Sequence, residues 1–527
     1  MIKIKNIIHN IIHRDNLYIW FIVLIGSLFR FHNLAGKSFW YDEACSVSFT
    51  QYSWQEAIFH RYMIKPVYFI LLKLWVSLFG TNEFAVRTLS VIFGSFSIFL
   101  IYKLGKNLFN KNIGLISAFI LLISPYHVYY SQQARNYSLF LFLGLLSMLI
   151  FLRLRRRITP TISLLFILNN LLLIYTHPFG IFILITQAVF SLIPWENRGE
   201  KKKIFFLLTI SFICALPIFI VFINNPANVG GNEINYIPVP SFSSIIETFE
   251  VFSYGGPKQG HCGLGFEINS SRLVIPRILT TIFLIIGIFG FLVRDESAQK
   301  KGSFISSSIS KLLLLFWLSF TILTVFIFSK LFTPLYLTRY FIVTSVPFYL
   351  LVARGIRKIP VLALKLVVTL IIAMSLLYSL NITYGLSSEC SWKELAVYIK
   401  SNIKDTDTIL LAPFRQIVPF WYYYHAEKER LKDVDVFGKR ISNKWQSSFY
   451  DGTNLVTGVE LGAANDAITQ MASKLEKRDT WLVVSPDWLE SNNYSLLKAN
   501  IEKTHIMKRR RYFEFDGVEV IYYTAIN

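Results

Sequence analysis

The stretch FAVRTLSVIFGSFSIFLIYKLGKNLFNKNIGLISAFILLI (84–123) decides the fold class. It holds two long apolar runs, and Lys103, Lys106 and Lys111 gather at and just beyond the end of the first run, before the second begins. A bilayer is spanned by about 20 apolar residues, so these runs predict membrane-spanning helices. Lysines that gather in a short linker between such runs indicate a loop on the cytoplasmic side.

The composition of the whole chain agrees with a membrane protein. Of the 527 residues, 54% are hydrophobic and 16% are charged, and the mean hydropathy is +0.47. A soluble globular protein carries about 25% charged residues. The net charge of +21 would favour a nucleic-acid partner in a soluble protein, but much of the excess lies in short loops between apolar runs. We therefore expect membrane lipids around the chain and no nucleic acid.

Apolar runs along the chain predict about eleven spans. They cover roughly 17–35, 84–104, 113–131, 136–152, 160–176, 178–194, 204–223, 272–293, 311–330, 339–353 and 360–382. The basic clusters between them all fall on one side, which the positive-inside rule makes cytoplasmic. We predict a multi-pass protein of the plasma (inner) membrane, with the N-terminus in the cytoplasm and the first helix retained.

Two domains follow from this pattern. Residues 1–383 form the transmembrane domain, with long external loops at 36–83 and 224–271, and residues 384–527 form an extracytoplasmic domain. The run PVYFILLKLWVSLFG (66–80) is short for a span, so we expect an interfacial or re-entrant helix.

The C-terminal domain changes in character. Short apolar runs there predict strands, and polar amphipathic runs predict helices, as in a small α/β domain. The predicted strands are DTILLA (407–412), TWLVVS (480–485) and VEVIYYT (518–524), and the predicted helices are WKELAVYIKSN (392–402) and NDAITQMASKLEK (465–477).

The first external loop contains SFWYDEACS (38–46), with Asp42 and Glu43 side by side. Two carboxylates at a helix start are often only a solvated pair that suits the helix dipole. The functional alternative is a carboxylate at the membrane surface that accepts a proton from an acceptor hydroxyl. The local sequence leaves both interpretations open.

Cationic and imidazole side chains gather on the same predicted membrane face. Lys65 precedes a proline, and is either a snorkelling lysine or a phosphate ligand at headgroup depth. Arg87 lies four residues after Glu83, a spacing that also suits a simple helical ion pair. SPYHVYYSQQARNYSL (124–139), THPFG (176–180) and LYLTRYF (335–341) add further candidates, which are His127, Gln133, Arg135, His177 and Arg339.

These segments carry a family resemblance. WYDEACS, KPVYFILLKLW, GTNEFAVRTLSVIFGSFSIFLIYKLGKNLF and SPYHVYYSQQARNYSL resemble bacterial membrane-integral glycosyltransferases of the GT-C type. More narrowly, the chain is similar to the dolichyl-phosphate-mannose–protein mannosyltransferase-like group, which includes the lipid A aminoarabinose transferases. The similarity is continuous over roughly residues 30–190 and weaker beyond.

The resemblance implies an inverting transferase that moves a sugar from a polyprenyl-phosphate carrier to a lipid, glycan or protein hydroxyl outside the membrane. It implies that Asp42 is the general base and that Glu43 completes the acidic pair. Lys65 matches a lysine that contacts the carrier phosphate, and Arg87 and Arg135 match arginines of the family pattern. We add Arg339 to this donor set, and His127, Gln133 and His177 as other candidate site residues.

The chain departs from the family pattern at Gln133, where the second external turn usually has glutamate. The loss of that carboxylate weakens any metal site between two external loops. We therefore expect no tightly held metal ion, with a divalent cation as the less favoured alternative. Two other functions stay open: a polyprenyl-linked glycan transporter or flippase, and a sensory membrane protein with a ligand-binding C-terminal domain.

Overall fold

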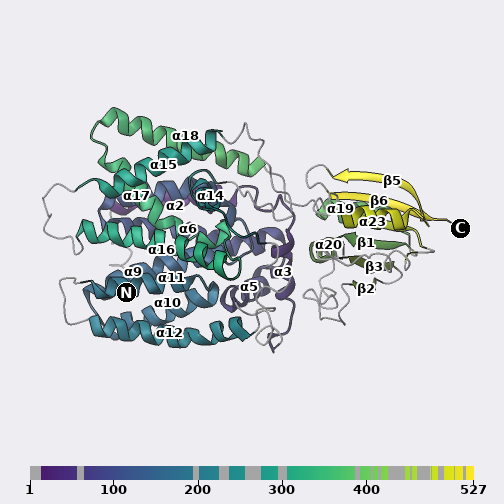
Figure 1. Cartoon of the computed structure of the whole chain (residues 1–527), viewed down its shortest axis with the longest axis horizontal. Coiled ribbons are helices and arrows are strands. Elements are labelled where there is room, and N and C mark those ends of the chain that lie inside the picture. Colours follow the sequence, from purple (N-terminus) through teal and green to yellow (C-terminus); the bar gives the residue numbers. More distant parts are fainter. Residues whose placement is uncertain are drawn as a thin grey trace.

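The computed structural model of the chain describes residues 14–55, 65–193, 201–224, 237–255, 274–294, 306–385, 392–404, 407–412, 417–424, 446–451, 454–459, 475, 478–484, 492–503, 505–513 and 518–526. A bundle of long helices forms one part of the molecule, and a smaller α/β part lies at one end of it (Figure 1). The chain is therefore an α-helical polytopic membrane protein with a small mixed sheet, as predicted.

Each predicted span lies on a helix or a helix pair of the bundle. The bundle helices are α2 (Arg14–Phe31), α6 (Glu83–Leu108), α7 (Lys111–Ile123), α8 (Pro125–Ser131), α9 (Tyr137–Arg156), α10 (Pro160–Thr176), α11 (Gly180–Leu192), α12 (Lys201–Asn224), α15 (Val274–Leu292), α16 (Ser307–Leu331), η3 (Thr338–Phe341), α17 (Ser345–Lys358) and α18 (Leu362–Gly385). Among the described residues, five helices are long and apolar enough to cross a membrane unaided: α6, α9, α12, α16 and α18. Several others are apolar helices of 10–17 residues, which depend on packing against neighbouring helices to lie in a membrane.

The predicted span 113–131 is wrong as a single helix. It is bent by 61° between α7 and α8, at Pro125. Proline has no N–H, so the Leu121 carbonyl loses its usual helical partner four residues on. Arg30 of α2 replaces that partner, since its Nη2 donates to Leu121 O at 3.1 Å and its Nη1 to Leu122 O at 3.2 Å. The bend turns α8 and the residues that follow it across the end of the bundle.

The predicted span 339–353 also differs from the structure. Residues 338–341 form the 3₁₀ turn η3, and the regular helix α17 begins only at Ser345. Pro347 cannot donate to the Val343 carbonyl, so a helix continuous through this point would lose a hydrogen bond. The helix start at Ser345 places Pro347 in the first turn, where no such bond is needed. Arg339 and Tyr340 consequently lie in a turn before the helix.

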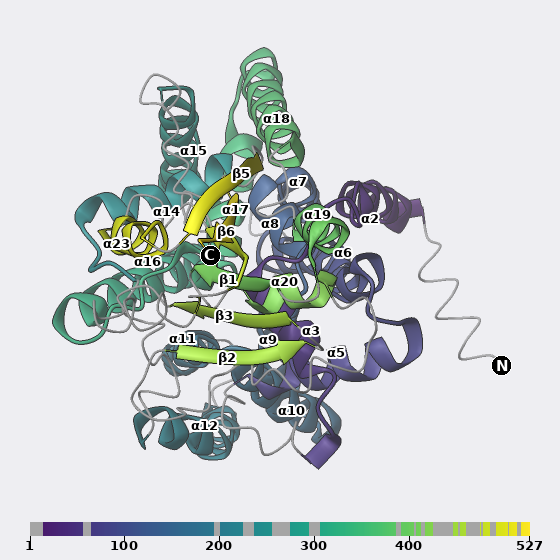
Figure 2. The same cartoon turned by 90° about the vertical axis from the view of Figure 1, so that its right-hand side faces the viewer.

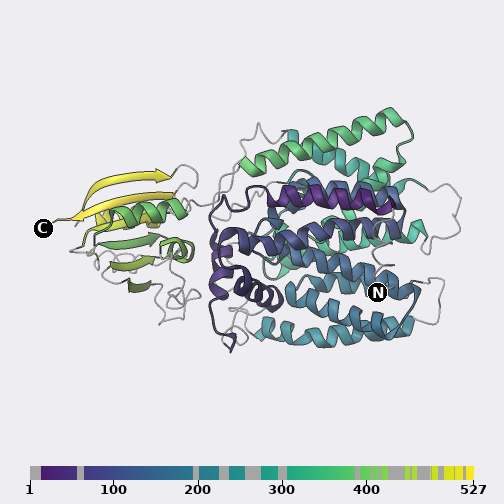
Figure 3. The same cartoon turned by 180° about the vertical axis from the view of Figure 1, so that it is seen from behind.

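Three further helices lie outside the predicted spans. They are α3 (Tyr41–Phe49), α5 (Pro66–Phe79) and α14 (Phe242–Tyr254). The segment 66–80, predicted as an interfacial or re-entrant helix, forms the helix α5, and its Lys73 donates to the carbonyls of Thr50 and Tyr52 at 2.8 and 2.5 Å. The helices α3 and α5, coloured purple, lie at the end of the bundle that faces the α/β part (Figure 3).

The helix α14 was not predicted within the loop 224–271. It ends at Gly255, which has φ +73° and lies so close to α8 that a Cβ would meet Pro125 Cβ at 2.6 Å. Only glycine fits both the backbone angle and the space. This contact fixes α14 against the bent end of the α7–α8 pair.

The α/β part contains a six-stranded sheet with the order β2-β3-β1-β4-β6-β5. Its elements are α19 (Trp392–Asn402), β1 (Thr408–Ala412), α20 (Ile417–Tyr424), β2 (Gln446–Asp451), β3 (Asn454–Val459), β4 (Thr480–Val484), α23 (Asn492–Ile501), β5 (His505–Phe513) and β6 (Val518–Ala525). The strand β1 runs parallel to β3 and β4, with Leu410 opposite Leu482, and the other pairs are antiparallel.

Burial explains which strands the sequence revealed. The central strands β1 and β4 are buried along their whole length, so TILLA and TWLVV are continuous apolar runs. The edge strand β5 reads HIMKRRRYF and carries no such pattern, which is why it was not predicted. The predicted helix 392–402 is confirmed as α19, whereas the predicted helix 465–477 lies almost wholly outside the described residues.

Candidate active site

Glu43 and Arg87 form a buried ion pair between α3 and the start of α6. Arg87 Nε lies 2.9 Å from Glu43 Oε1, and Nη2 lies 2.7 Å from Oε2. The same guanidinium donates to the carbonyls of Leu34, Lys37 and Ser38 at 2.8 to 2.9 Å. Arg87 therefore fixes both the segment 34–38 and Glu43 of α3. Its ion pair is with Glu43, not with Glu83 four residues before it on α6.

A third segment is tied to the same carboxylate. The backbone N–H of Ala134, in the turn after α8, donates to Glu43 Oε1 at 2.7 Å. Both oxygens of Glu43 are thus occupied, and its side chain is 1% exposed. The Glu43 carboxylate therefore links α3 to Arg87 of α6 and to the turn at Ala134. Both of its oxygens accept hydrogen bonds from the protein, and neither faces solvent.

Asp42, the neighbouring residue on α3, has different surroundings. Its side chain is 22% exposed, and Oδ2 lies 3.3 Å from Arg135 Nη2 and 4.0 Å from Arg339 Nη1. Arg135 also donates through Nη1 to the Asp42 carbonyl at 3.2 Å and to Ser46 Oγ at 3.3 Å. One turn of helix therefore presents two acids with distinct environments: Glu43 is enclosed and Asp42 is reachable.

Lys65 joins the same cluster from the N-terminus of α5. Its Nζ lies 5.5 Å from the centre of the Tyr340 ring, and the Arg339 guanidinium carbon lies 5.6 Å from that ring. Burial, assisted by the nearby charges of Arg135 and Arg339 and opposed by Asp42, lowers the pKa of Lys65 to about 7. Among the residues that the structure describes, Lys65 makes no ion pair with a carboxylate. Three cationic side chains thus lie around one partly exposed carboxylate, and we name Asp42, Lys65, Arg135 and Arg339 the cation cluster.

His177 lies beside the cation cluster in the turn between α10 and α11. Its ring stacks on Phe140 at 4.8 Å and lies 5.0 Å from the Tyr340 ring. Burial, and then the charges of Lys65, Arg339 and Arg135, lower the pKa of His177 well below its ordinary value. The Phe179 N–H donates to His177 Nδ1 at 3.2 Å, so the neutral ring carries its proton on Nε2. Nε2 has no hydrogen-bond partner within the described part of the chain.

Two predicted residues lie apart from this group or add little to its charge. His127 is buried in α8, and its Nε2 lies 2.8 Å from Ser345 Oγ of α17, so it serves the packing of the bundle. Gln133 is buried in the turn that supplies Ala134 and Arg135, and its Oε1 has no partner among the described residues. An amide at that position contributes no negative charge to the turn.

The α/β part touches the segment before α3 through α20. The Phe39 N–H donates to Tyr423 Oη at 2.7 Å, and that hydroxyl donates to Glu83 Oε1 at 3.0 Å. Tyr422 Oη donates to the Thr81 carbonyl at 2.8 Å. Seen from the side of the sheet, α20 lies over α3 (Figure 2). Tyr423 therefore connects the α/β part to the residues immediately before Asp42.

Sequence reasoning missed two of these residues. Tyr340 lies among Lys65, Arg339 and His177, and its only signal was its position next to Arg339 in LYLTRYF. Tyr423 gave no local signal, because a tyrosine in IVPFWYYY is indistinguishable from a core aromatic. The described residues contain no group of three or more His, Cys, Asp or Glu side chains suited to a metal ion.

Comparisons with known proteins agree with this architecture. Residues 65–221 match the family model of dolichyl-phosphate-mannose-protein mannosyltransferases. That segment contains Lys65, Arg87, Arg135 and His177. No curated protein matches the chain by sequence.

Solved structures share the fold. ArnT from Cupriavidus metallidurans, bound to undecaprenyl phosphate, is 14% identical with a TM-score of 0.53, and the match covers 96% of this chain and 98% of that one. The Archaeoglobus fulgidus oligosaccharyltransferase AglB, in complex with an inhibitory peptide and a dolichol-phosphate, is 12% identical with a TM-score of 0.52, over 97% of this chain and 74% of that one.

By its fold and its matched segment, the chain is similar to one class of protein, the polytopic membrane glycosyltransferases of the GT-C type. Within that class, the resemblance to the dolichyl-phosphate-mannose–protein mannosyltransferase group is confirmed by the match over residues 65–221.

Proposed function

We propose that the chain is an inverting glycosyltransferase that moves a sugar from a polyprenyl-phosphate carrier to a hydroxyl acceptor on the outer face of the membrane. The sugar is a hexose or pentose, and the acceptor is a lipid, a glycan or a protein. Two relatives in fold carry such lipids in their structures, undecaprenyl phosphate in ArnT and dolichol-phosphate in AglB.

The observation that carries the proposal is the imbalance of charge in the cation cluster. Lys65, Arg135 and Arg339 supply up to three positive charges, and Asp42 supplies one negative charge. Burying such an excess of like charge is unfavourable unless an anion joins it. The phosphodiester of a polyprenyl-phosphate sugar carries one negative charge and lies at the depth of the lipid headgroups. Its polyprenyl chain can stay in the surrounding lipid while the phosphate binds.

The same charges favour the reaction itself. When the bond between the sugar C1 and the phosphate oxygen breaks, that oxygen keeps the electron pair, and the leaving phosphate becomes more negative than the bound donor. Cations held in place around the phosphate therefore stabilise the transition state more than the ground state. No proton is needed on the leaving group, because a phosphate is already a good one.

Asp42 is the base in this proposal. The acceptor oxygen forms the new bond to C1 on the face opposite the phosphate, which inverts the configuration, and its proton passes to the Asp42 carboxylate. Before the donor binds, Asp42 contacts Arg135 at 3.3 Å and Arg339 at 4.0 Å, and these contacts lower its basicity. A bound phosphate competes for both arginines, so donor binding loosens their hold on Asp42 and frees it for the acceptor.

Glu43 and Arg87 take a positioning role. Their buried pair fixes α3 against α6 and the turn at Ala134, so that Asp42 and Arg135 meet in one geometry. Neither side chain is available to the donor while that pair is intact.

The test is a transfer assay in proteoliposomes that contain a polyprenyl-phosphate sugar and extracted envelope glycolipids. Mass spectrometry should find free polyprenyl phosphate and a glycosylated acceptor. Movement of the donor across the bilayer without its consumption would instead indicate a flippase. Comparison of surface glycans with and without the gene would then name the sugar and the acceptor.

Orientation is tested separately by cysteine labelling of intact cells. Cysteines placed at 36–55 and 392–404 should react with a reagent that does not cross the membrane, and one placed at 157–159 should not. An accessible cysteine in the 157–159 linker would reverse the proposed topology.

A further inference from the structure

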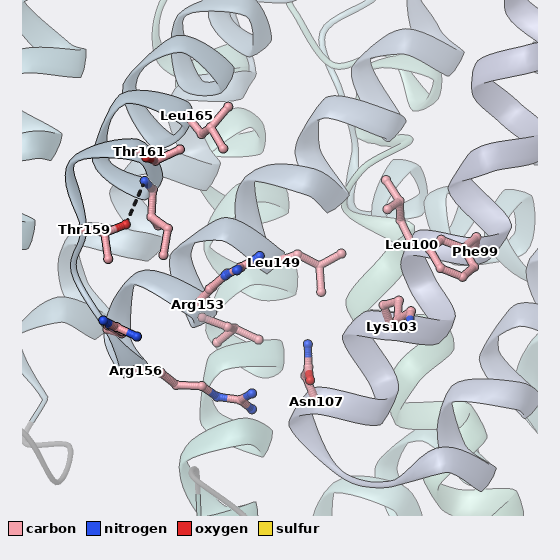
Figure 4. Close-up of a pocket in the computed structure, with 13 residues that line it drawn as sticks. Phe99, Leu100, Lys103, Asn107, Leu149, Arg153, Arg156, Thr159, Thr161 and Leu165 are labelled. Atoms are coloured by element: carbon pink, nitrogen blue, oxygen red, sulfur yellow. Dashed lines mark hydrogen bonds between the residues drawn. The ribbon is translucent and has the colours of Figure 1, made fainter. Parts of the chain in front are cut away.

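A large cavity lies at the opposite end of the bundle from Asp42. It has a volume of about 820 Å³ and lies between the C-terminal end of α6, the C-terminal end of α9 and the start of α10 (Figure 4). The helix α6 runs from Glu83, near the cation cluster, to Leu108. At 1.5 Å per residue, Lys103 is about 30 Å along that helix from its first residue, so this cavity is separate from the proposed active site.

The wall of the cavity changes from apolar to cationic along the helix axes. Phe99, Leu100 and Leu149 line it toward the interior of the bundle, and Lys103 and Arg153 follow one turn further toward the end (Figure 4). Arg156 and Arg157 complete the cationic rim. Residues three and four apart share one face of a helix, which explains why 149, 153 and 156 of α9 and 99, 100 and 103 of α6 face the same space.

The positive-inside rule alone does not account for this arrangement. In the run RLRRR (153–157), Arg155 is buried and donates to the carbonyls of Ser191 and Ile193 at 3.1 and 3.2 Å, so it has a structural task. The other three arginines line the cavity. None of the lining residues is acidic, and the sequence contains no Asp or Glu between Glu83 and Glu196.

We propose that this cavity binds the phosphate headgroup of an anionic phospholipid from the leaflet opposite the active site. The cationic rim takes the phosphate, and the apolar wall takes the first carbons of an acyl chain. Asn107 and Thr161 also line the cavity and provide hydrogen-bonding groups. A zwitterionic lipid carries a positive group beside its phosphate, so the rim selects against it. The proposal is independent of the transfer reaction.

The experiment is a lipid titration of the purified full-length protein by native mass spectrometry, with phosphatidylglycerol and phosphatidylcholine as probes. We expect tighter binding of phosphatidylglycerol. Basic residues near a membrane surface contribute about 1 kcal/mol each to anionic lipid binding, so Arg153→Gln with Arg156→Gln should weaken phosphatidylglycerol about 10-fold or more. The matched control is Lys202→Gln with Lys203→Gln, two exposed lysines at the start of α12 that do not line the cavity.

A second variant guards against misfolding of the double mutant. Leu165 lines the cavity and is 51% exposed, so Leu165→Trp fills the space without a change in charge and should also weaken the lipid. Equal phosphatidylglycerol affinity in the arginine variant and the wild type would overturn the proposal, as would an equal loss in the lysine control. Displacement of the lipid by millimolar inorganic phosphate would overturn the lipid in favour of a soluble phosphate ligand.

Discussion

Arg87 Nη2 lies 2.7 Å from Glu43 Oε2 across 44 residues of chain, while Asp42, one residue before Glu43, contacts Arg135 and Arg339 instead. The adjacent carboxylates of Asp42 and Glu43 thus have different cationic partners. The structural pair is enclosed, and the second carboxylate lies in the cation cluster.

Breaking the enclosed pair should cost stability. Loss of one partner of a buried ion pair typically destabilises a protein by about 3–5 kcal/mol, because the other charge stays buried. Glu43→Gln should therefore lower the unfolding midpoint in detergent, and Glu43→Gln with Arg87→Met should cost less than the sum of the single changes. A Glu43→Gln protein with wild-type unfolding and no transfer would make Glu43 the base in place of Asp42.

Asp42→Asn should remove activity without loss of the fold. The change is nearly isosteric at a partly exposed site, so unfolding should stay close to that of the wild type. Donor binding should not weaken, because Asp42 competes with the phosphate for Arg135 and Arg339. Loss of a general base typically lowers the rate by about 10²–10⁴-fold, which the proteoliposome transfer assay can measure. Transfer near the wild-type rate would return Asp42 to the role of a solvated acid.

Donor binding should depend on pH through Lys65. Its pKa of about 7 in the free protein must rise when a phosphate binds, so above pH 7 each binding event takes up a proton. We expect donor affinity to be constant at lower pH and to fall about 10-fold per pH unit above 7, since one proton is coupled to binding. Lys65→Arg keeps its charge and should flatten the profile; the same slope in Lys65→Arg would remove Lys65 from the phosphate site.

Tyr423→Phe should slow transfer from a distance. The substitution removes the acceptor of the Phe39 N–H and a donor to Glu83, and one such hydrogen bond contributes about 1 kcal/mol. We expect a several-fold lower kcat with unchanged donor affinity. Tyr422→Phe is the control, because its hydroxyl reaches the Thr81 carbonyl rather than the segment before Asp42. Equal effects of both substitutions would mean that the contact only stabilises the domain interface.

Chelation should leave transfer unchanged. Asp42 is shared by two arginines and Glu43 is enclosed by Arg87, so neither carboxylate is arranged as a metal ligand. Activity that disappears with EDTA and returns with a divalent ion would contradict this expectation, and Asp42 would be the first ligand to substitute.

The sequence by itself determined the membrane class and the positions of most bundle helices, and it named Asp42, Lys65, Arg135 and Arg339 as candidates before the structure brought them together. Hydropathy is a property of local composition, so the helices α6, α9, α10 and α19 lie almost where the runs 84–104, 136–152, 160–176 and 392–402 predicted them. The central strands β1 and β4 were visible for the same reason.

Only the tertiary structure decided which charged side chains pair with one another. The contact of Arg30 with the Leu121 carbonyl, the pairing of Arg87 with Glu43 rather than Glu83, and the approach of Lys65 to the Tyr340 ring all join segments far apart in the chain. Such contacts cannot be predicted from local sequence, because the residues around an arginine are the same whether its partner is four or 44 residues away. Charge interactions depend on distance and burial, and the fold alone sets both.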